Sequence, residues 1–262
     1  MKSQLVRFAK TSVLKITRTL GVKQSEASLV AQSQDYWAKG ESSRFRANSH
    51  WRGDDGISAD TFATLGEQHL DMFAQFNLLT GHAWPLERVI EWGCGGGSNA
   101  LAFARVCKNF VGVDVSQPTL DAFTKCMVDE NIHHTTPVLI RVDEPEKLPI
   151  NMDGTCDMFL CTFVFELVPT PEYGKRLLTI ARRLLKPGAT AMIQIKYATA
   201  DASTKPRRWG YRFNVANMTT YSIDDFWQTC ESAGLKPLAI KLLPDAPLVG
   251  DGRYAYFFLQ KI

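Results

Sequence analysis

The residues whose types and spacing best support chemistry form a glycine-rich stretch, Glu91-Trp92-Gly93-Cys94-Gly95-Gly96-Gly97-Ser98-Asn99. This stretch follows an apolar run at 88–92 that is typical of a strand and leads into a helical pattern at 98–107. Glycines at such a junction allow a sharp turn and let a ligand approach the backbone without a Cβ in the way. Asp114, 21 residues after Gly93, can then hold the hydroxyls of a ribose. The pattern predicts a nucleoside-binding site.

Two residues of this stretch argue against a pyrophosphate ligand. The dinucleotide fingerprint GxGxxG requires a glycine at position 98, where this chain has Ser98. The carboxylate of Glu91 at the mouth of the turn suits a cationic ligand and repels a phosphate. The sequence therefore favours a positively charged nucleoside and disfavours a nicotinamide oxidoreductase.

The elements that must position this site alternate along the chain. Strand patterns at 88–92, 110–114, 138–142, 157–162 and 190–196 are separated by helical patterns at 98–107, 118–131 and 171–185. Such alternation, with nearly continuous apolar strands, indicates a parallel sheet covered on both faces. After a helix at 222–233, strands at 237–243 and 254–260 are joined by residues 244–253 alone, which suits an antiparallel pair. We expect an α/β fold: a doubly wound, mostly parallel, seven-stranded, Rossmann-like sheet ending in an antiparallel hairpin, with an N-terminal helical extension.

The chain divides into three predicted parts: residues 1–23, a helical cap at 24–85, and a ligand-binding domain at 86–262. Residues 1–23 carry six Lys or Arg side chains and no acid, with apolar side chains at helical spacing. The pattern predicts a basic amphipathic helix, for which three roles stay open. It packs on its own domain or a partner subunit, it lies on an anionic membrane through residues 1–20, or it is a cleaved transit peptide.

Composition excludes several function classes. The 262 residues carry 30 Lys and Arg against 27 Asp and Glu, which gives a net charge of +3. The electrostatic field of so small a charge is too weak to indicate nucleic-acid binding. None of the six cysteines forms a CxxC pair, and no HExxH motif occurs, so we expect neither a disulfide scaffold nor a metal site. No apolar run is long enough to span a bilayer. We predict a cytoplasmic protein, in membrane contact if residues 1–20 bind lipid.

Residues 86–262 resemble the class I S-adenosylmethionine-dependent methyltransferases. The glycine-rich motif is similar to the first motif of that family, Asp114 to its second-strand acid, residues 156–169 to its fourth-strand motif, and Leu184-Leu185-Lys186-Pro187-Gly188-Ala189 to the turn before its fifth strand. The resemblance implies that S-adenosylmethionine is bound and S-adenosylhomocysteine is released. It implies that Glu91 lies near the methionine amino group, that Asp114 binds the ribose, and that Val115 and Asp143 lie at the adenine. The remaining implied cofactor residues are Trp92, Gly93, Gly95, Gly97, Asn99, Thr162 and Phe163.

The resemblance does not supply a general base. Many small-molecule members carry His immediately after the acid that corresponds to Glu166, whereas this chain has Leu167. Glu166, at the carboxyl end of the fourth strand, is our first candidate for a catalytic base. His50 and His82 are the alternatives.

The acceptor is expected to lie under residues 198–220, a lid-like insertion after the fifth strand. This segment interleaves cations with aromatic side chains, a composition that can hold an anionic or sugar-like acceptor. With Trp37 and Trp51 it would cover the acceptor, so Arg208→Ala should weaken acceptor binding and leave cofactor binding intact. The expected acceptor-binding residues are Trp51, Tyr197, Arg208 and Tyr211.

These observations predict methyl transfer by in-line displacement to a small-molecule, glycan or lipid-precursor acceptor, most readily at a hydroxyl. The alternatives are a protein or RNA methyltransferase and a non-catalytic S-adenosylmethionine-binding scaffold. The Asp/Asn-Pro-Pro-Tyr-like signature of many amino-group methylating members is absent after the fourth strand, where Thr162 is followed by Phe163. The sequence leaves open whether the chain forms a homodimer.

Overall fold

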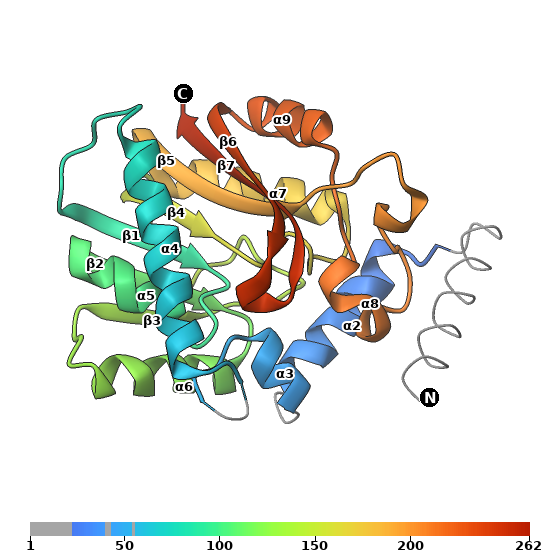
Figure 1. The fold of residues 1–262 in the computed structure, drawn as a ribbon, viewed down its shortest axis with the longest axis horizontal. Coiled ribbons are helices and arrows are strands. Elements are labelled where there is room, and N and C mark those ends of the chain that lie inside the picture. Colours follow the sequence, from blue (N-terminus) through green and yellow to red (C-terminus); the bar gives the residue numbers. More distant parts are fainter. Residues whose placement is uncertain (1–22, 40–42, 54–55) are drawn as a thin grey trace.

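The computed structural model describes residues 23–39, 43–53 and 56–262 and contains a seven-stranded sheet (Figure 1). The strand order is β3-β2-β1-β4-β5-β7-β6. Strands β1 to β5 pair in parallel, and β7 lies antiparallel between β5 and β6, which confirms the predicted fold. The strands are β1 (Leu86–Trp92), β2 (Cys107–Asp114), β3 (Thr135–Leu139), β4 (Cys156–Cys161), β5 (Leu185–Lys196), β6 (Leu235–Ala246) and β7 (Asp251–Lys261).

Several strand boundaries differ from the sequence prediction, and β2 and β5 begin at Cys107 and Leu185 instead of 110 and 190. The third strand begins and ends about three residues earlier than the predicted 138–142, because Thr135 and Leu139 pair with Phe110 and Asp114 of β2. The hairpin is also longer than expected, since pairing continues to Ala246 and Asp251. Only the short helix η4 (Pro247–Val249) and Gly250 remain between its strands. The extended hairpin curves away from the sheet toward the helical cap (Figure 1).

Helices cover both faces of the sheet and enclose two separate cores. The helices that follow strands are α5 (Ser98–Phe103), η1 (Ala104–Val106), α6 (Gln117–Asp129), α7 (Pro171–Leu184) and α9 (Ile223–Ser232). The hydroxyls of Ser116, Thr170 and Ser222 each accept a hydrogen bond from the backbone amide three residues later, which satisfies one of the free amides at the start of α6, α7 and α9.

The first helices of the described chain are α2 (Glu26–Lys39), α3 (Ser43–Asn48) and α4 (Ala59–Asn77). Helix α4 packs beside α5 against one face of the sheet, while α2 lies next to α8 (Tyr211–Asn214) (Figure 1). Segment 198–220 also contains η2 (Ala202–Thr204) and η3 (Val215–Asn217). A third core, with Trp37 and Tyr211 at its centre, joins this segment to α2 and α3.

The predicted helix at 1–23 falls almost wholly outside the described residues. Within the described ranges, no helix combines the length and apolarity needed to cross a bilayer. All six cysteines are buried and unpaired.

Candidate active site

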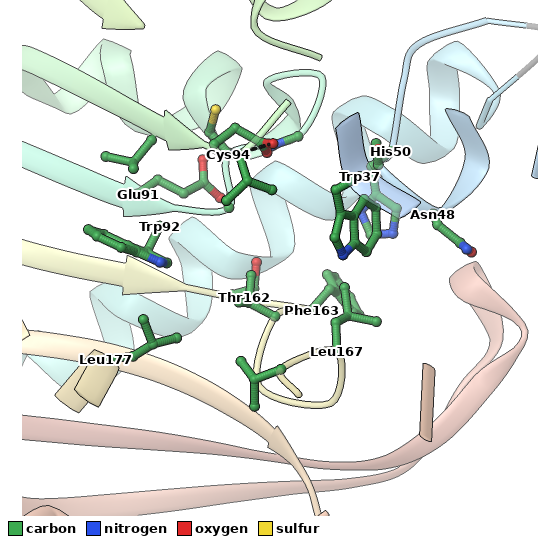
Figure 2. Close-up of a pocket in the computed structure, with 18 of the residues that line it drawn as sticks. Trp37, Asn48, His50, Glu91, Trp92, Cys94, Thr162, Phe163, Leu167 and Leu177 are labelled. Carbon is green, nitrogen blue, oxygen red and sulfur yellow. Dashed lines mark hydrogen bonds between the residues drawn. The ribbon is translucent and has the colours of Figure 1, made fainter. Parts of the chain in front are cut away.

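The main pocket opens at the carboxyl ends of β1, β2 and β4 and is covered by the helical cap. Figure 2 shows Glu91 and Trp92 at the end of β1 and, across the cavity, Trp37, Asn48 and His50 of the cap, with Thr162 and Phe163 between them. Ligands of open α/β sheets bind at this end of the strands, in the crevice at the point where the strand order reverses.

The glycine-rich turn holds the cap as well as shaping the cavity. Gly93, Gly95 and Gly97 have φ of 77°, 53° and 99°, the left-handed region that favours glycine. A Cβ on Gly95 would lie 2.5 Å from the carbonyl oxygen of Ser49, and one on Gly96 would lie 2.6 Å from that of His50. The amide of Gly96 donates to the Ser49 carbonyl at 3.0 Å. Glycines here therefore let the cap backbone close directly over the turn.

Glu91 supplies a buried carboxylate to the pocket. The residue is 2% exposed, and the Asn99 Nδ2 donates to its Oε1 at 2.5 Å. Its Oε2 has no hydrogen-bond partner among the described residues. Burial raises the pKa of Glu91 well above its usual range, and the nearby Asp114 adds to this shift. A cationic group bound in the pocket would compensate this carboxylate, so the site fits the amino group of a methionine-type ligand.

Asp114 ends β2 and faces the same cavity. Its Oδ1 accepts from the amides of Val115 at 2.7 Å and Ser116 at 3.0 Å, and its Oδ2 accepts from the amide of Gly95 at 3.2 Å. Burial raises the pKa of Asp114 to about 6, against the opposing effect of these three amides. Carboxylate oxygens have further lone pairs, so the fixed carboxylate can also accept hydrogen bonds from two ribose hydroxyls.

The structure brings most of the predicted cofactor residues together. Besides the two acids, the predicted residues that line the pocket are Trp92, Gly93, Gly95, Asn99, Val115, Thr162 and Phe163. Apolar side chains that include Val113, Ile140 and Leu177 form a wall suited to a purine ring. Gly97 does not line the cavity, because it packs against Phe123 and Met127 of α6.

Asp143 lies outside the pocket, contrary to the expectation that it meets the adenine. Beyond β3 successive side chains point in opposite directions, so that Ile140 and Val142 face the cavity while Arg141 and Asp143 face solvent. The Asp143 carboxylate accepts from the Arg141 guanidinium at 2.6 Å and 2.9 Å. The adjacent Val142 lines the pocket in place of Asp143.

Glu166 also points away from the cavity. The turn after β4 places Phe163 (φ 57°) and Leu167 in the pocket wall and directs Phe165 and Glu166 into the interior. The buried Glu166 carboxylate lies among charged and polar groups of β5 and β7, which include Lys196, and burial raises its pKa to about 7. The structure therefore gives the predicted base no access to the cavity.

Of the four predicted acceptor residues, Tyr211 alone lines the pocket. Its hydroxyl accepts from the Trp37 Nε1 at 2.8 Å and donates to the Leu167 carbonyl at 2.6 Å. Trp51 turns toward α6, where its Nε1 donates to the Thr119 hydroxyl at 3.3 Å. Tyr197 packs on the core beneath α7 and α9.

Arg208 is exposed and does not line the cavity, so the structure gives no basis for its predicted contact with the acceptor. Its carbonyl accepts from the amide of Gln24 at 2.9 Å, which ties the insertion to the start of the cap.

The cap contributes pocket residues that sequence reasoning did not assign to binding. His69 of α4 is buried and also reaches the pocket, as do Asn48 and Ser33. His50, weighed as an alternative base, has φ of 49°, and its ring centroid lies 4.8 Å from that of Phe163. Burial lowers the pKa of His50 to about 4. His82 does not line the pocket.

The described residues contain no group of three His, Cys, Asp or Glu side chains that could hold a metal ion.

A seven-stranded sheet with an antiparallel β7, a glycine turn after β1 and acids on β1 and β2 together define a nucleoside-binding α/β domain of the methyltransferase type.

Comparison with known proteins agrees with this class. Residues 90–193 match the family model described as "Methyltransferase domain". The ubiquinone biosynthesis O-methyltransferase of Xanthomonas campestris is 30% identical over 120 residues, which cover 46% of this chain and 47% of that protein. The corresponding Ralstonia nicotianae enzyme is 27% identical over 180 residues, 64% of this chain and 70% of that protein. The chain thus spans about half the length of the Xanthomonas relative.

Among solved structures, the magnesium protoporphyrin IX methyltransferase of Synechocystis PCC 6803, determined with bound S-adenosylhomocysteine, aligns with a TM-score of 0.61. The alignment covers 87% of this chain and 98% of that one at 13% identity, so it supports the fold alone. Residues 90–193 thus match a methyltransferase domain, and the fold is that of an S-adenosylmethionine-dependent methyltransferase, the class whose cofactor is S-adenosylmethionine.

Proposed function

We propose that this chain transfers the methyl group of S-adenosylmethionine to a hydroxyl of an uncharged small molecule. The observation that carries the proposal is the pair of acids in one cavity: Glu91, with an unpartnered buried oxygen, and Asp114, held by three amides. A ligand with an amino group and a ribose compensates both acids at once.

S-adenosylmethionine supplies a methyl group that its sulfonium already activates, so the chain mainly positions donor and acceptor and excludes water. Glu91 would bind the amino group, Asp114 the ribose hydroxyls, and the wall around Ile140 and Leu177 the adenine. The cap closes over the glycine turn through the bond between Gly96 and Ser49, which limits the access of solvent.

The acceptor side of the cavity supports a neutral substrate. Trp37, Phe163, Leu167 and Tyr211 are mainly apolar, and no Lys or Arg of the described chain lines the pocket. An anionic acceptor would be buried there without a partner, which is costly. The O-methyltransferase names of the relatives support oxygen as the atom that receives the methyl group.

His50 is the group in the cavity best suited to receive the hydroxyl proton. A pKa lowered to about 4 leaves its imidazole neutral at physiological pH, and such a weak base suffices because bonding to the methyl carbon makes the hydroxyl proton strongly acidic. As the acceptor oxygen forms its bond to the methyl carbon and the sulfur–methyl bond breaks, the O–H proton passes to His50 and then to solvent.

Transfer of a labelled methyl group to a panel of neutral and carboxylated alcohols and phenols tests the proposal. We expect turnover with neutral members, and His50→Gln should lower kcat about 100-fold with little change in S-adenosylhomocysteine affinity. His82→Gln is the matched control and should keep full activity.

Binding of S-adenosylhomocysteine without any transfer would favour the scaffold alternative. Transfer only to protein or RNA would favour the macromolecular alternative. Absence of S-adenosylhomocysteine binding would refute the assignment of the pocket. The membrane contact of residues 1–20 and the homodimer stay predictions, to be tested by vesicle co-sedimentation and sedimentation velocity.

A further inference from the structure

A buried hydrogen-bonded chain leads from the cap and the hairpin to Glu91. The Tyr256 hydroxyl lies 3.0 Å from Nε2 of His69, and the His69 Nδ1 lies 2.7 Å from Oδ1 of Asn99. The Nδ2 of Asn99 donates to Oε1 of Glu91 at 2.5 Å and to the Thr162 hydroxyl at 3.0 Å. These five side chains come from β7, α4, α5, β1 and the end of β4.

The chemistry of the groups determines the direction of every bond. With a cationic group bound, Glu91 is ionised and can only accept, so the amide of Asn99 must present its NH2 group to the carboxylate and its oxygen to His69. Nδ1 of His69 therefore donates. A neutral imidazole has one N–H, so Nε2 accepts from the Tyr256 hydroxyl. Burial lowers the pKa of His69 to about 4 and raises that of Tyr256, which keeps the imidazole neutral and the phenol protonated.

Helix α4 holds His69 in this position by very close packing on α5. A Cβ on Gly66 would lie 2.1 Å from the Ser98 carbonyl oxygen, so glycine alone permits the observed approach. One turn earlier on α4, the Phe62 carbonyl accepts from the Ser98 hydroxyl at 2.6 Å. This packing therefore fixes the position of His69 relative to Ser98, which precedes Asn99 in the chain.

We propose that His69 is a positioning residue for the cofactor: by donating to Asn99 it orients the amide that directs Glu91 toward the amino group of the ligand. This inference rests on the proposed function. Without His69 the buried oxygen of Asn99 loses its donor, so the amide is no longer held in this orientation and Glu91 loses its alignment toward the ligand.

Calorimetry with two ligands tests the proposal. S-adenosylhomocysteine carries the amino acid, whereas 5′-methylthioadenosine keeps adenine, ribose and sulfur but lacks it. We expect His69→Leu to weaken S-adenosylhomocysteine about tenfold and 5′-methylthioadenosine less than twofold. His69→Gln, which restores a donor toward Asn99, should recover most of the affinity. Gln68→Leu, on the exposed side of the same helix, is the matched control.

Equal weakening of both ligands, or of neither, would overturn the proposal. A second measurement applies even if His69→Leu fails to fold: nitrogen NMR of the unsubstituted protein saturated with S-adenosylhomocysteine should show a protonated Nδ1 and an unprotonated Nε2 on His69. The opposite tautomer would overturn the proposal as well. If the unsubstituted protein does not bind S-adenosylhomocysteine, the proposed function fails first, and the two failures are thus distinguishable.

Discussion

Glu91 and Glu166 make an instructive pair. Each lies at or just beyond the carboxyl end of a central strand, each is 2% exposed, and each has one carboxylate oxygen without a hydrogen-bond partner among the described residues. Glu91 faces the cavity from β1, whereas the turn after β4 directs Glu166 into the interior beside Lys196. Burial and strand position therefore do not define a site. The direction that the local turn gives the side chain separates a carboxylate that faces the cavity from one that is enclosed in the interior.

Asp114 and Asp143 repeat the contrast at the ends of β2 and β3. Three backbone amides hold the carboxylate of Asp114 at the pocket. The exposed Arg141 holds the carboxylate of Asp143 on the surface. The nearest amides and cations thus determine which acid can meet a ligand.

The largest effect is expected at Glu91. Glu91→Gln removes the negative charge that we propose binds the amino group, so the affinity for S-adenosylhomocysteine should fall about 100-fold by calorimetry. Glu166→Gln should change it less than twofold. If the two variants lost affinity equally, the distinction between the carboxylates would be wrong.

A smaller loss is expected at Asp114. Asp114→Asn removes the two proposed charge-assisted hydrogen bonds to the ribose, so the affinity for S-adenosylhomocysteine should fall about tenfold. Asp143→Asn should leave this affinity unchanged. The pKa of Asp114 is raised to about 6, so in the unsubstituted protein affinity should decline as the pH falls below 6, when the carboxylate takes up a proton. Asp114→Asn should flatten this decline. A pH profile with the same slope in both proteins would contradict the assigned role.

The smallest effect on binding, but a measurable one on stability, is expected at Glu166. Its folded-state pKa of about 7 exceeds its ordinary value of 4.5, so its stabilising contribution is fully present below pH 4.5 and is lost as the pH rises through 7. Glu166→Gln removes this dependence. Between pH 4.5 and pH 8, the unfolding free energy of the Glu166→Gln variant should therefore rise by about 3 kcal/mol relative to that of the unsubstituted protein. Chemical denaturation at the two pH values measures this, and parallel curves would refute it.

The sequence predicted residues that act through local backbone geometry. Gly93, Gly95, Glu91 and Asp114 were found because a strand, a glycine turn and a following acid lie close together along the chain. Prediction was weaker for residues that act across long separations. The bond between Trp37 and Tyr211 spans 174 positions, and no local pattern marks either residue as a partner of the other.

Amino-acid sequence by itself determined the alternating strands and helices, the closing hairpin and the nucleoside end of the site. These depend on hydrophobic periodicity and on turn residues that act over a few positions. Only the tertiary structure decided which acids face the cavity, that the cap supplies His50 and His69, and that the cations of segment 198–220 stay outside the pocket. A side chain's direction beyond a strand end depends on what packs behind it, and that packing comes from parts of the chain far away in sequence.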